Sequence, residues 1–130
     1  MKNAFVVGLA LLSLAAMKSA AHPHDIYLGR KDPKTGGSCC STNAGAGYGD
    51  CAKLTIEPGV LTAEADGYRI RLTEEQAQRI NPFRSGSVDV VVTWDRVQES
   101  PDGNWHICIP GQKLETMRSD FYCFMAPNNI

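Results

Sequence analysis

Alternation of apolar and polar residues defines the middle of the chain. In residues 68–72, a tyrosine, an isoleucine and a leucine alternate with two arginines, which is the two-residue period of a strand with one buried face. An Asp-Gly turn signal precedes this segment, and a Pro-Gly pair separates residues 52–57 from residues 60–65. These three segments predict a three-stranded antiparallel meander.

The second half of the chain predicts three further strands. Residues 87–94 are rich in β-branched side chains and predict the best central strand. Residues 105–109 follow a Pro-Asp-Gly turn, and residues 121–126 form the last predicted strand. One face of the 105–109 strand is expected to carry Trp105, Ile107 and Ile109, and the opposite face His106 and Cys108.

Residues 73–80 carry the signals of one short helix. Thr73 and Gln76 have capping-box spacing, and the two glutamates after Thr73 suit the positive end of a helix. Pro82 ends the pattern, because proline lacks the backbone N–H that a continuing helix requires. The predicted fold class is therefore mainly β, with a small antiparallel sheet or partly open barrel and one short helix.

The beginning of the chain divides into two parts. Residues 1–21 contain an apolar run of 14 residues and end in small residues, which predicts a signal peptide cleaved after Ala21. This run is too short to cross a hydrocarbon layer of ~30 Å comfortably, and no later segment matches it, so no membrane span is expected. Residues 22–50 predict a loop-rich, cysteine-containing segment, and residues 51–130 a small β domain.

Charge argues against one class of partner. Cleavage after Ala21 leaves 109 residues with 11 basic and 14 acidic side chains, a net charge of −3. The arginines are spread singly among acidic residues, whereas a nucleic-acid-binding protein carries a basic patch. No nucleic-acid partner is expected. A domain of this size buries a modest core and gains stability from covalent cross-links.

Five cysteines remain in the exported part, and all are disulfide candidates, because export leads to an oxidising compartment: Cys39, Cys40, Cys51, Cys108 and Cys123. One must be left over, as a buried inert thiol, a reactive thiol or a partner of another molecule. A bridge between adjacent Cys39 and Cys40 would strain their peptide, which leaves twelve two-bridge arrangements. The closely spaced pairs typical of zinc sites do not occur.

Strand pairing suggests two of these arrangements. Antiparallel pairing of residues 105–109 with 121–126 could place Cys108 opposite Cys123, and Cys51 would then reach back to Cys39 or Cys40. Register does not follow from sequence, so the other arrangements stay open.

Several short motifs follow one another in the exported part: HD-x-Y, SCC, DC, DGYRIRL, SPDGNWHICI and FYCFMAP. As a set they resemble a group of small, uncharacterised exported proteins of Gram-negative bacteria, over nearly the whole exported part. The chain departs from that group by the insertion TNAGAGYG before Asp50 and by a His-Pro ahead of the His-Asp. The resemblance implies export and a cysteine framework, assigns no reaction, and makes His24 the matching histidine.

The candidate metal ligands are His22, His24 and His106. Cleavage after Ala21 makes His22 the amino terminus, where its amine and imidazole could chelate copper. His24 or His106 would then supply a second imidazole at ~2 Å from the metal. A square-planar amino-terminal site cannot form in its usual way, because Pro23 has no amide proton to lose.

The function predicted from these observations is a secreted or periplasmic, disulfide-stabilised binding or structural module whose partner is a protein or a cell-envelope component. Copper binding by the amino-terminal histidine is the alternative, and a small hydrolase ranks third. No catalytic residue is assigned, because no hydrolase motif occurs. The candidate contact residues, where exposed, are Trp94, Trp105, Tyr122 and Phe124.

Overall fold

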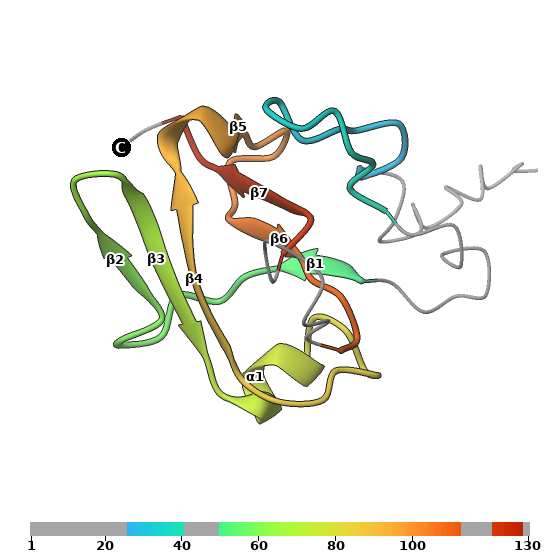
Figure 1. Cartoon of the computed structure of the whole chain (residues 1–130), viewed down its shortest axis with the longest axis vertical. Coiled ribbons are helices and arrows are strands. Elements are labelled where there is room, and N and C mark those ends of the chain that lie inside the picture. Colours follow the sequence, from blue (N-terminus) through green and yellow to red (C-terminus); the bar gives the residue numbers. More distant parts are fainter. Residues whose placement is uncertain (1–25, 41–49, 113–120, 129–130) are drawn as a thin grey trace, which may run out of the picture.

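The computed structural model describes residues 26–40, 50–112 and 121–128, and within them the predicted mainly β fold is confirmed. Seven short strands in these residues form two sheets (Figure 1). The strands are β1 Cys51–Lys53, β2 Leu61–Ala63, β3 Gly67–Leu72, β4 Val88–Thr93, β5 Val97–Glu99, β6 His106–Cys108 and β7 Cys123–Ala126. The helix α1 spans Glu74–Gln78, and the 3-10 turn η2 spans Trp94–Arg96.

The smaller sheet is antiparallel, with strand order β2-β3-β4. β3 and β4 pair along their full length, and Ile70 lies opposite Val90. The side chains of Arg69 and Asp89 lie on the solvent face, where they form an ion pair with a closest N···O distance of 3.0 Å. The alternation in residues 68–72 therefore predicted this strand and its buried face correctly.

The predicted meander is wrong in its first strand. β1 pairs with β6 of the larger sheet, and the chain between Leu54 and Val60 passes from one sheet to the other (Figure 1). The predicted central strand, β4, is an edge strand of the smaller sheet among the described residues. Both errors have one cause, since alternation shows which face of a strand is buried but not which strand lies beside it.

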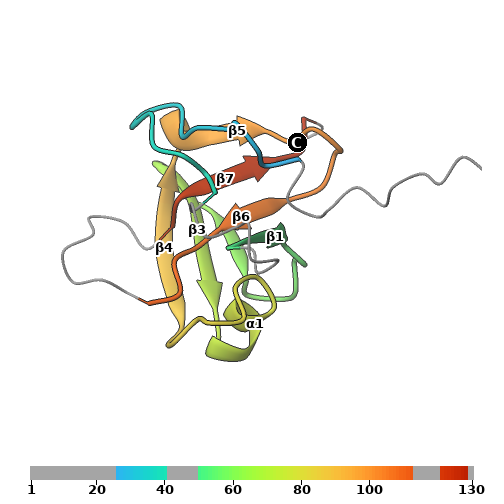
Figure 2. The ribbon, with the colours of Figure 1, turned by 90° about the vertical axis from the view of Figure 1, so that its right-hand side faces the viewer.

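The larger sheet has strand order β1-β6-β7-β5, and β5 is parallel to β7 while the other pairs are antiparallel. Figure 2 shows its strands running across the direction of β3 and β4. Trp105, Ile107 and Ile109 contribute to the core between the sheets, whereas His106 and Cys108 face the opposite side. The two faces predicted for residues 105–109 are confirmed.

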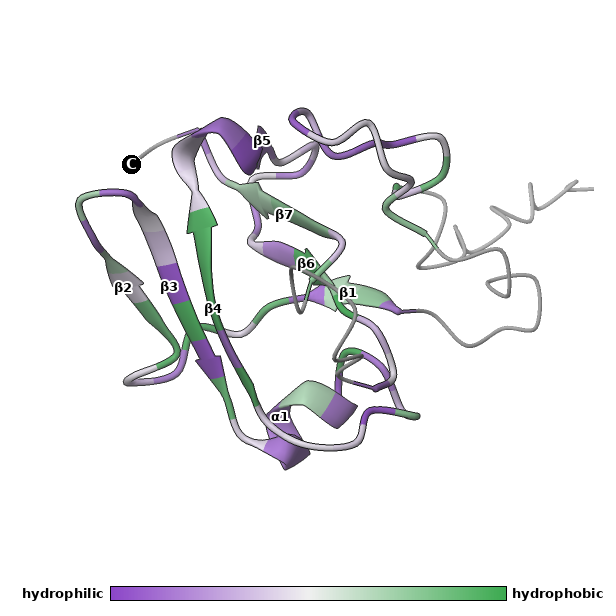
Figure 3. Ribbon diagram, viewed as in Figure 1, coloured by the Kyte–Doolittle hydropathy of each residue, from purple (hydrophilic) through white to green (hydrophobic). Residues whose placement is uncertain are grey.

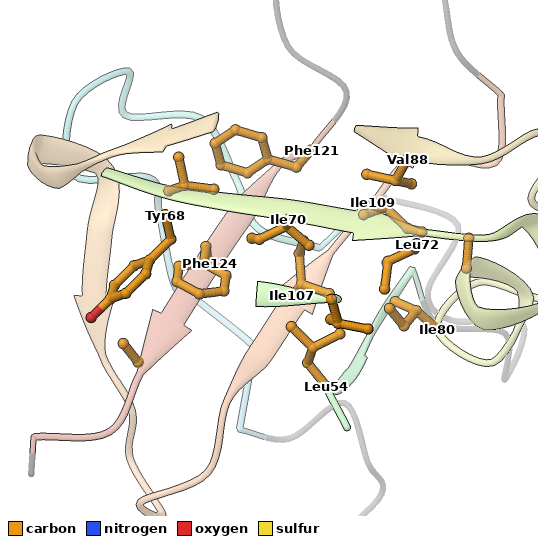
Figure 4. Packing of buried hydrophobic residues seen from close by; sticks show 14 residues of the cluster. Leu54, Tyr68, Ile70, Leu72, Ile80, Val88, Ile107, Ile109, Phe121 and Phe124 are labelled. Atoms are coloured by element: carbon orange, nitrogen blue, oxygen red, sulfur yellow. The ribbon is translucent and has the colours of Figure 1, made fainter. Parts of the chain in front are cut away.

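The main hydrophobic core lies between the two sheets. Figure 3 shows apolar and polar positions alternating along β3. Figure 4 shows Ile70 of this strand pointing toward Ile107 and Phe124, and Leu72 farther along the strand on the same side. These four side chains are at most 3% exposed. Each stabilises the fold by roughly 1.5–3 kcal/mol relative to an exposed position.

The helix follows its sequence signals. Thr73 Oγ1 accepts a hydrogen bond from the Gln76 N–H at 3.1 Å, and Gln76 Oε1 accepts one from the Thr73 N–H at 2.9 Å. This confirms the capping box. The helix ends at Gln78, four residues before Pro82, and buries Ala77 against the core.

Residues 26–40 contain no named helix or strand and are fixed by polar contacts to the η2 region. Asp32 is fully buried and accepts hydrogen bonds from the Arg96 side chain at 2.8 Å and from the backbone N–H groups of Lys34 and Thr35. Burial acts to raise the pKa of Asp32, but these hydrogen bonds outweigh it and lower the pKa. The loop is therefore organised around an ionised carboxylate.

Candidate functional site

A second hydrophobic cluster lies on the outer face of the larger sheet. We call it the cysteine cluster; its buried members are Tyr27, Cys39, Cys51, Cys108, Cys123 and Met125. Ile26, Cys40 and Tyr122 pack against it. Tyr27 comes from the HD-x-Y motif, and the cysteines come from the SCC, DC, HICI and FYCF motifs. Motifs that are far apart in the sequence therefore meet in one place.

A chain of hydrogen bonds runs along one side of this cluster, from the buried Tyr27 to the exposed Asp102. The Tyr27 hydroxyl lies 2.7 Å from His106 Nδ1, and His106 Nε2 lies 2.7 Å from Asp102 Oδ1. Tyr27 and His106 are each 2% exposed. The same Asp102 oxygen accepts hydrogen bonds from the Ser100 hydroxyl and the Asn104 N–H.

The pKa values of the end groups show which of them keeps its proton. Burial, together with the negative charge of Asp102, raises the pKa of Tyr27 to about 12, so its hydroxyl keeps the proton at neutral pH. The hydrogen bond from His106 is the main reason why the pKa of Asp102 is well below its usual value, and Asp102 is ionised. A neutral imidazole fits both partners, because it accepts from Tyr27 at Nδ1 and donates to Asp102 from Nε2.

This arrangement bears on the copper hypothesis. Both ring nitrogens of His106 are held by protein groups, so metal binding there would require Tyr27 or Asp102 to move away. His22 and His24 lie outside the described residues, as does the signal peptide predicted for residues 1–21. The copper site stays a prediction.

We expect Tyr27→Phe to lower the free energy of unfolding by about 1–3 kcal/mol, because it leaves the buried Nδ1 of His106 without its partner. Chemical denaturation followed by circular dichroism measures this loss. Tyr122→Phe removes the same hydroxyl from a half-buried tyrosine beside the cluster, and its effect should stay below about 0.5 kcal/mol. Equal effects of the two substitutions would contradict a stabilising role for the hydrogen bond between Tyr27 and His106.

Two disulfides cross the cysteine cluster. Cys51 of β1 is bonded to Cys108 of β6, and Cys39 is bonded to Cys123 of β7. Both suggested arrangements, in which Cys51 reaches Cys39 or Cys40, are wrong. Cys108 does lie opposite Cys123 as expected, but it also lies opposite Cys51, because β6 is between β1 and β7.

Cys40 is the free cysteine, and all five cysteines lie in the described residues. Its Sγ is 3.9 Å from the Sγ of Cys51. The ligand atoms of Cys40, Asp50 and Cys51 lie within 4.8 Å of one another, which is close enough for a metal site. Because the Cys51 sulfur is in a disulfide, it offers no thiolate, and these residues are not a complete metal-binding set.

A separate cleft of about 360 Å³ lies beside β5 on the surface. Its lining includes Tyr68, Trp94, Val97, Gln98, Glu99 and Pro127. Trp94 is 48% exposed, while its indole Nε1–H donates to the Ala65 carbonyl at 2.8 Å and its ring packs edge-on against Tyr68. The ring is thus fixed and exposed.

The other candidate contact residues lie deeper. Trp105 and Tyr122 are half-buried, and Phe124 is fully buried in the main core. Trp94 is therefore the candidate that presents a large aromatic surface to solvent.

Some functional candidates were missed by sequence reasoning. Tyr27 and Asp102 were not connected to His106, although Asp102 precedes His106 by four residues and both lie in one motif. Tyr27 is 79 residues away from His106 and carried no signal of this contact apart from its own motif.

The fold and the two bridges define a small, disulfide-stabilised β domain, and disulfides indicate an oxidising, extracytoplasmic environment. The described residues include no helix with the length and apolar character needed to cross a membrane. Comparison with protein-family models, curated proteins and solved structures finds no match to the chain.

Proposed function

We propose that the protein is an exported binding module that works in the periplasm or outside the cell. Its partner is a protein or another cell-envelope component, and its contact surface is the cleft at Trp94. The signal-peptide pattern of residues 1–21 and the two disulfides support export. The motif resemblance to exported proteins of Gram-negative bacteria supports a bacterial envelope as the location.

The observation that carries the binding role is the exposed, fixed ring of Trp94. Its hydrogen bond to Ala65 and its contact with Tyr68 hold the ring in one orientation, so little side-chain freedom is lost on binding. Nearly half of the residue nevertheless remains in contact with water. A partner that covers this surface gains the free energy of apolar burial.

A protein surface is the partner that this cleft favours. Tryptophan and tyrosine are enriched at the centres of protein interfaces, and polar groups commonly form the rim. Here Trp94 supplies the exposed aromatic surface and packs against the buried Tyr68, while Gln98 and Glu99 supply hydrogen-bonding groups beside it. The cleft is open to solvent, whereas small-molecule sites enclose most of their ligand.

Trp94→Ala tests this proposal. The exported protein is mixed with envelope fragments of the producing bacterium, and binding is measured by co-sedimentation. We expect the dissociation constant to rise at least about tenfold, as at the central residue of an interface. Phe83→Ala is the matched control, because Phe83 is a 66% exposed aromatic residue outside this cleft, and we expect no change.

Two treatments identify the partner. Binding that is lost after protease treatment of the fragments supports a protein partner. Binding to purified peptidoglycan that depends on Trp94 would show that the partner is a glycan of the envelope and not a protein. Binding that is the same with and without Trp94, or no binding at all, would overturn the proposed contact surface.

A further inference from the structure

The free thiol of Cys40 is in contact with a disulfide. Its Sγ lies 3.9 Å from the Sγ of Cys51, which is bonded to Cys108. Cys40 is half-buried at the edge of the cysteine cluster, and its neighbour Cys39 is bonded to Cys123. This second bridge holds Cys40 beside Cys51. A thiol and a disulfide in contact are the reactants of thiol–disulfide exchange.

We propose that Cys40 and Cys108 compete for the bond to Cys51, so that the protein interconverts between two disulfide isomers. The thiolate of Cys40 attacks the Sγ of Cys51. The Cys40–Cys51 bond forms while the Cys51–Cys108 bond breaks, and Cys108 leaves as a thiolate. The proton lost by Cys40 is balanced by the proton that Cys108 takes up from water. One disulfide and one thiol are present before and after, so no oxidant or reductant is needed.

The exchange changes which part of the chain is bonded to β1. In the described structure, the disulfide joins β1 to β6. In the second isomer it joins β1 to the segment of residues 26–40, which is already bonded to β7 through Cys39. The backbone pairing of β1 with β6 keeps Cys108 opposite Cys51, so the reverse reaction has its reactants in place.

The surroundings of Cys40 control the rate of exchange, because they set the fraction of its thiol that is ionised. Burial, together with the nearby negative charge of Asp50, raises the pKa of the Cys40 thiol. The negative charge of an ionised Cys40 also acts on Tyr27, whose own pKa is raised, and Tyr27 stays neutral well above neutral pH. The thiolate is therefore scarce at neutral pH. Below the pKa of the thiol, each pH unit increases the thiolate, and with it the exchange rate, about tenfold.

Cys108→Ser in the exported protein tests the geometry. We expect Cys40 to take the place of Cys108, so that the variant contains bridges Cys39–Cys123 and Cys40–Cys51 and no free thiol. Thiol counting and peptide mapping without reduction measure this result. In the matched control Cys123→Ser, Cys39 loses its partner, and we expect two free thiols. Two free thiols at Cys40 and Cys51 in Cys108→Ser would overturn the proposal.

A second measurement uses the unmodified protein and so does not depend on the folding of a variant. The protein is held at acidic pH, transferred to pH 7, 8 or 9, quenched with acid at intervals and digested with an acid protease. We expect a peptide joining Cys40 to Cys51 to appear about ten times faster at pH 8 than at pH 7. Its absence at all three pH values would overturn the exchange.

Discussion

Removal of the Cys39–Cys123 disulfide is expected to lower the free energy of unfolding by about 3–4 kcal/mol. The two cysteines are 84 residues apart, but the Cys51–Cys108 bridge lies within this loop and shortens it by 57 residues. The outer bridge therefore closes an effective loop of about 27 residues, and the chain-entropy cost of such a loop gives the expected loss. Small domains have a free energy of unfolding of only about 5–15 kcal/mol, so the expected loss is a large fraction of the total stability.

The double variant Cys39→Ala/Cys123→Ala and chemical denaturation measure this loss. Cys40→Ser is the control, because it removes a thiol that is in no bridge, and its effect should stay within about 1 kcal/mol. A double variant as stable as the original protein would show that the bridge is dispensable for the fold.

Arg84→Gln is expected to lower the free energy of unfolding by about 3 kcal/mol or more. Arg84 is 2% exposed, and its guanidinium donates to the carbonyls of Gly86, Ser87 and Pro110 at 2.7–3.1 Å. It thereby joins the turn after α1 to the segment that follows β6. Glutamine is shorter, so at least two of these carbonyls would lose their donor.

The matched control for this prediction is Arg71→Gln. This variant makes the same change of side chain at an exposed position. Arg71 lies on the solvent face of β3, where its closest ion-pair distance to Asp89 is 3.7 Å. Exposed ion pairs contribute little, so we expect a change below about 0.5 kcal/mol by the same denaturation measurement. Similar losses in Arg71→Gln and Arg84→Gln would contradict the special role of the buried guanidinium.

The parts of the fold that depend on local contacts could be predicted from the sequence. The capping box of Thr73 and Gln76 joins residues three positions apart, so its signal lies within one short segment. The faces of residues 105–109 follow from the alternation of side chains along any strand. These features need no knowledge of the rest of the chain.

The parts that depend on long-range pairing could not be predicted. The pairing of β1 with β6 brings together Cys51 and Cys108, which are 57 residues apart, and no local pattern distinguishes this neighbour from β2. The contact of Tyr27 with His106 also joins residues far apart in the sequence, and no local pattern indicates it. Arg84 resembles the exposed arginines in sequence, and its carbonyl partners, which explain its burial, are known only from the fold.

The measurement that tests this account most directly is disulfide mapping of the exported protein, kept at acidic pH to prevent exchange and digested without reduction. The account predicts peptides joining Cys39 to Cys123 and Cys51 to Cys108, with the free thiol at Cys40. A peptide joining Cys108 to Cys123, or five free thiols in a folded protein, would contradict it.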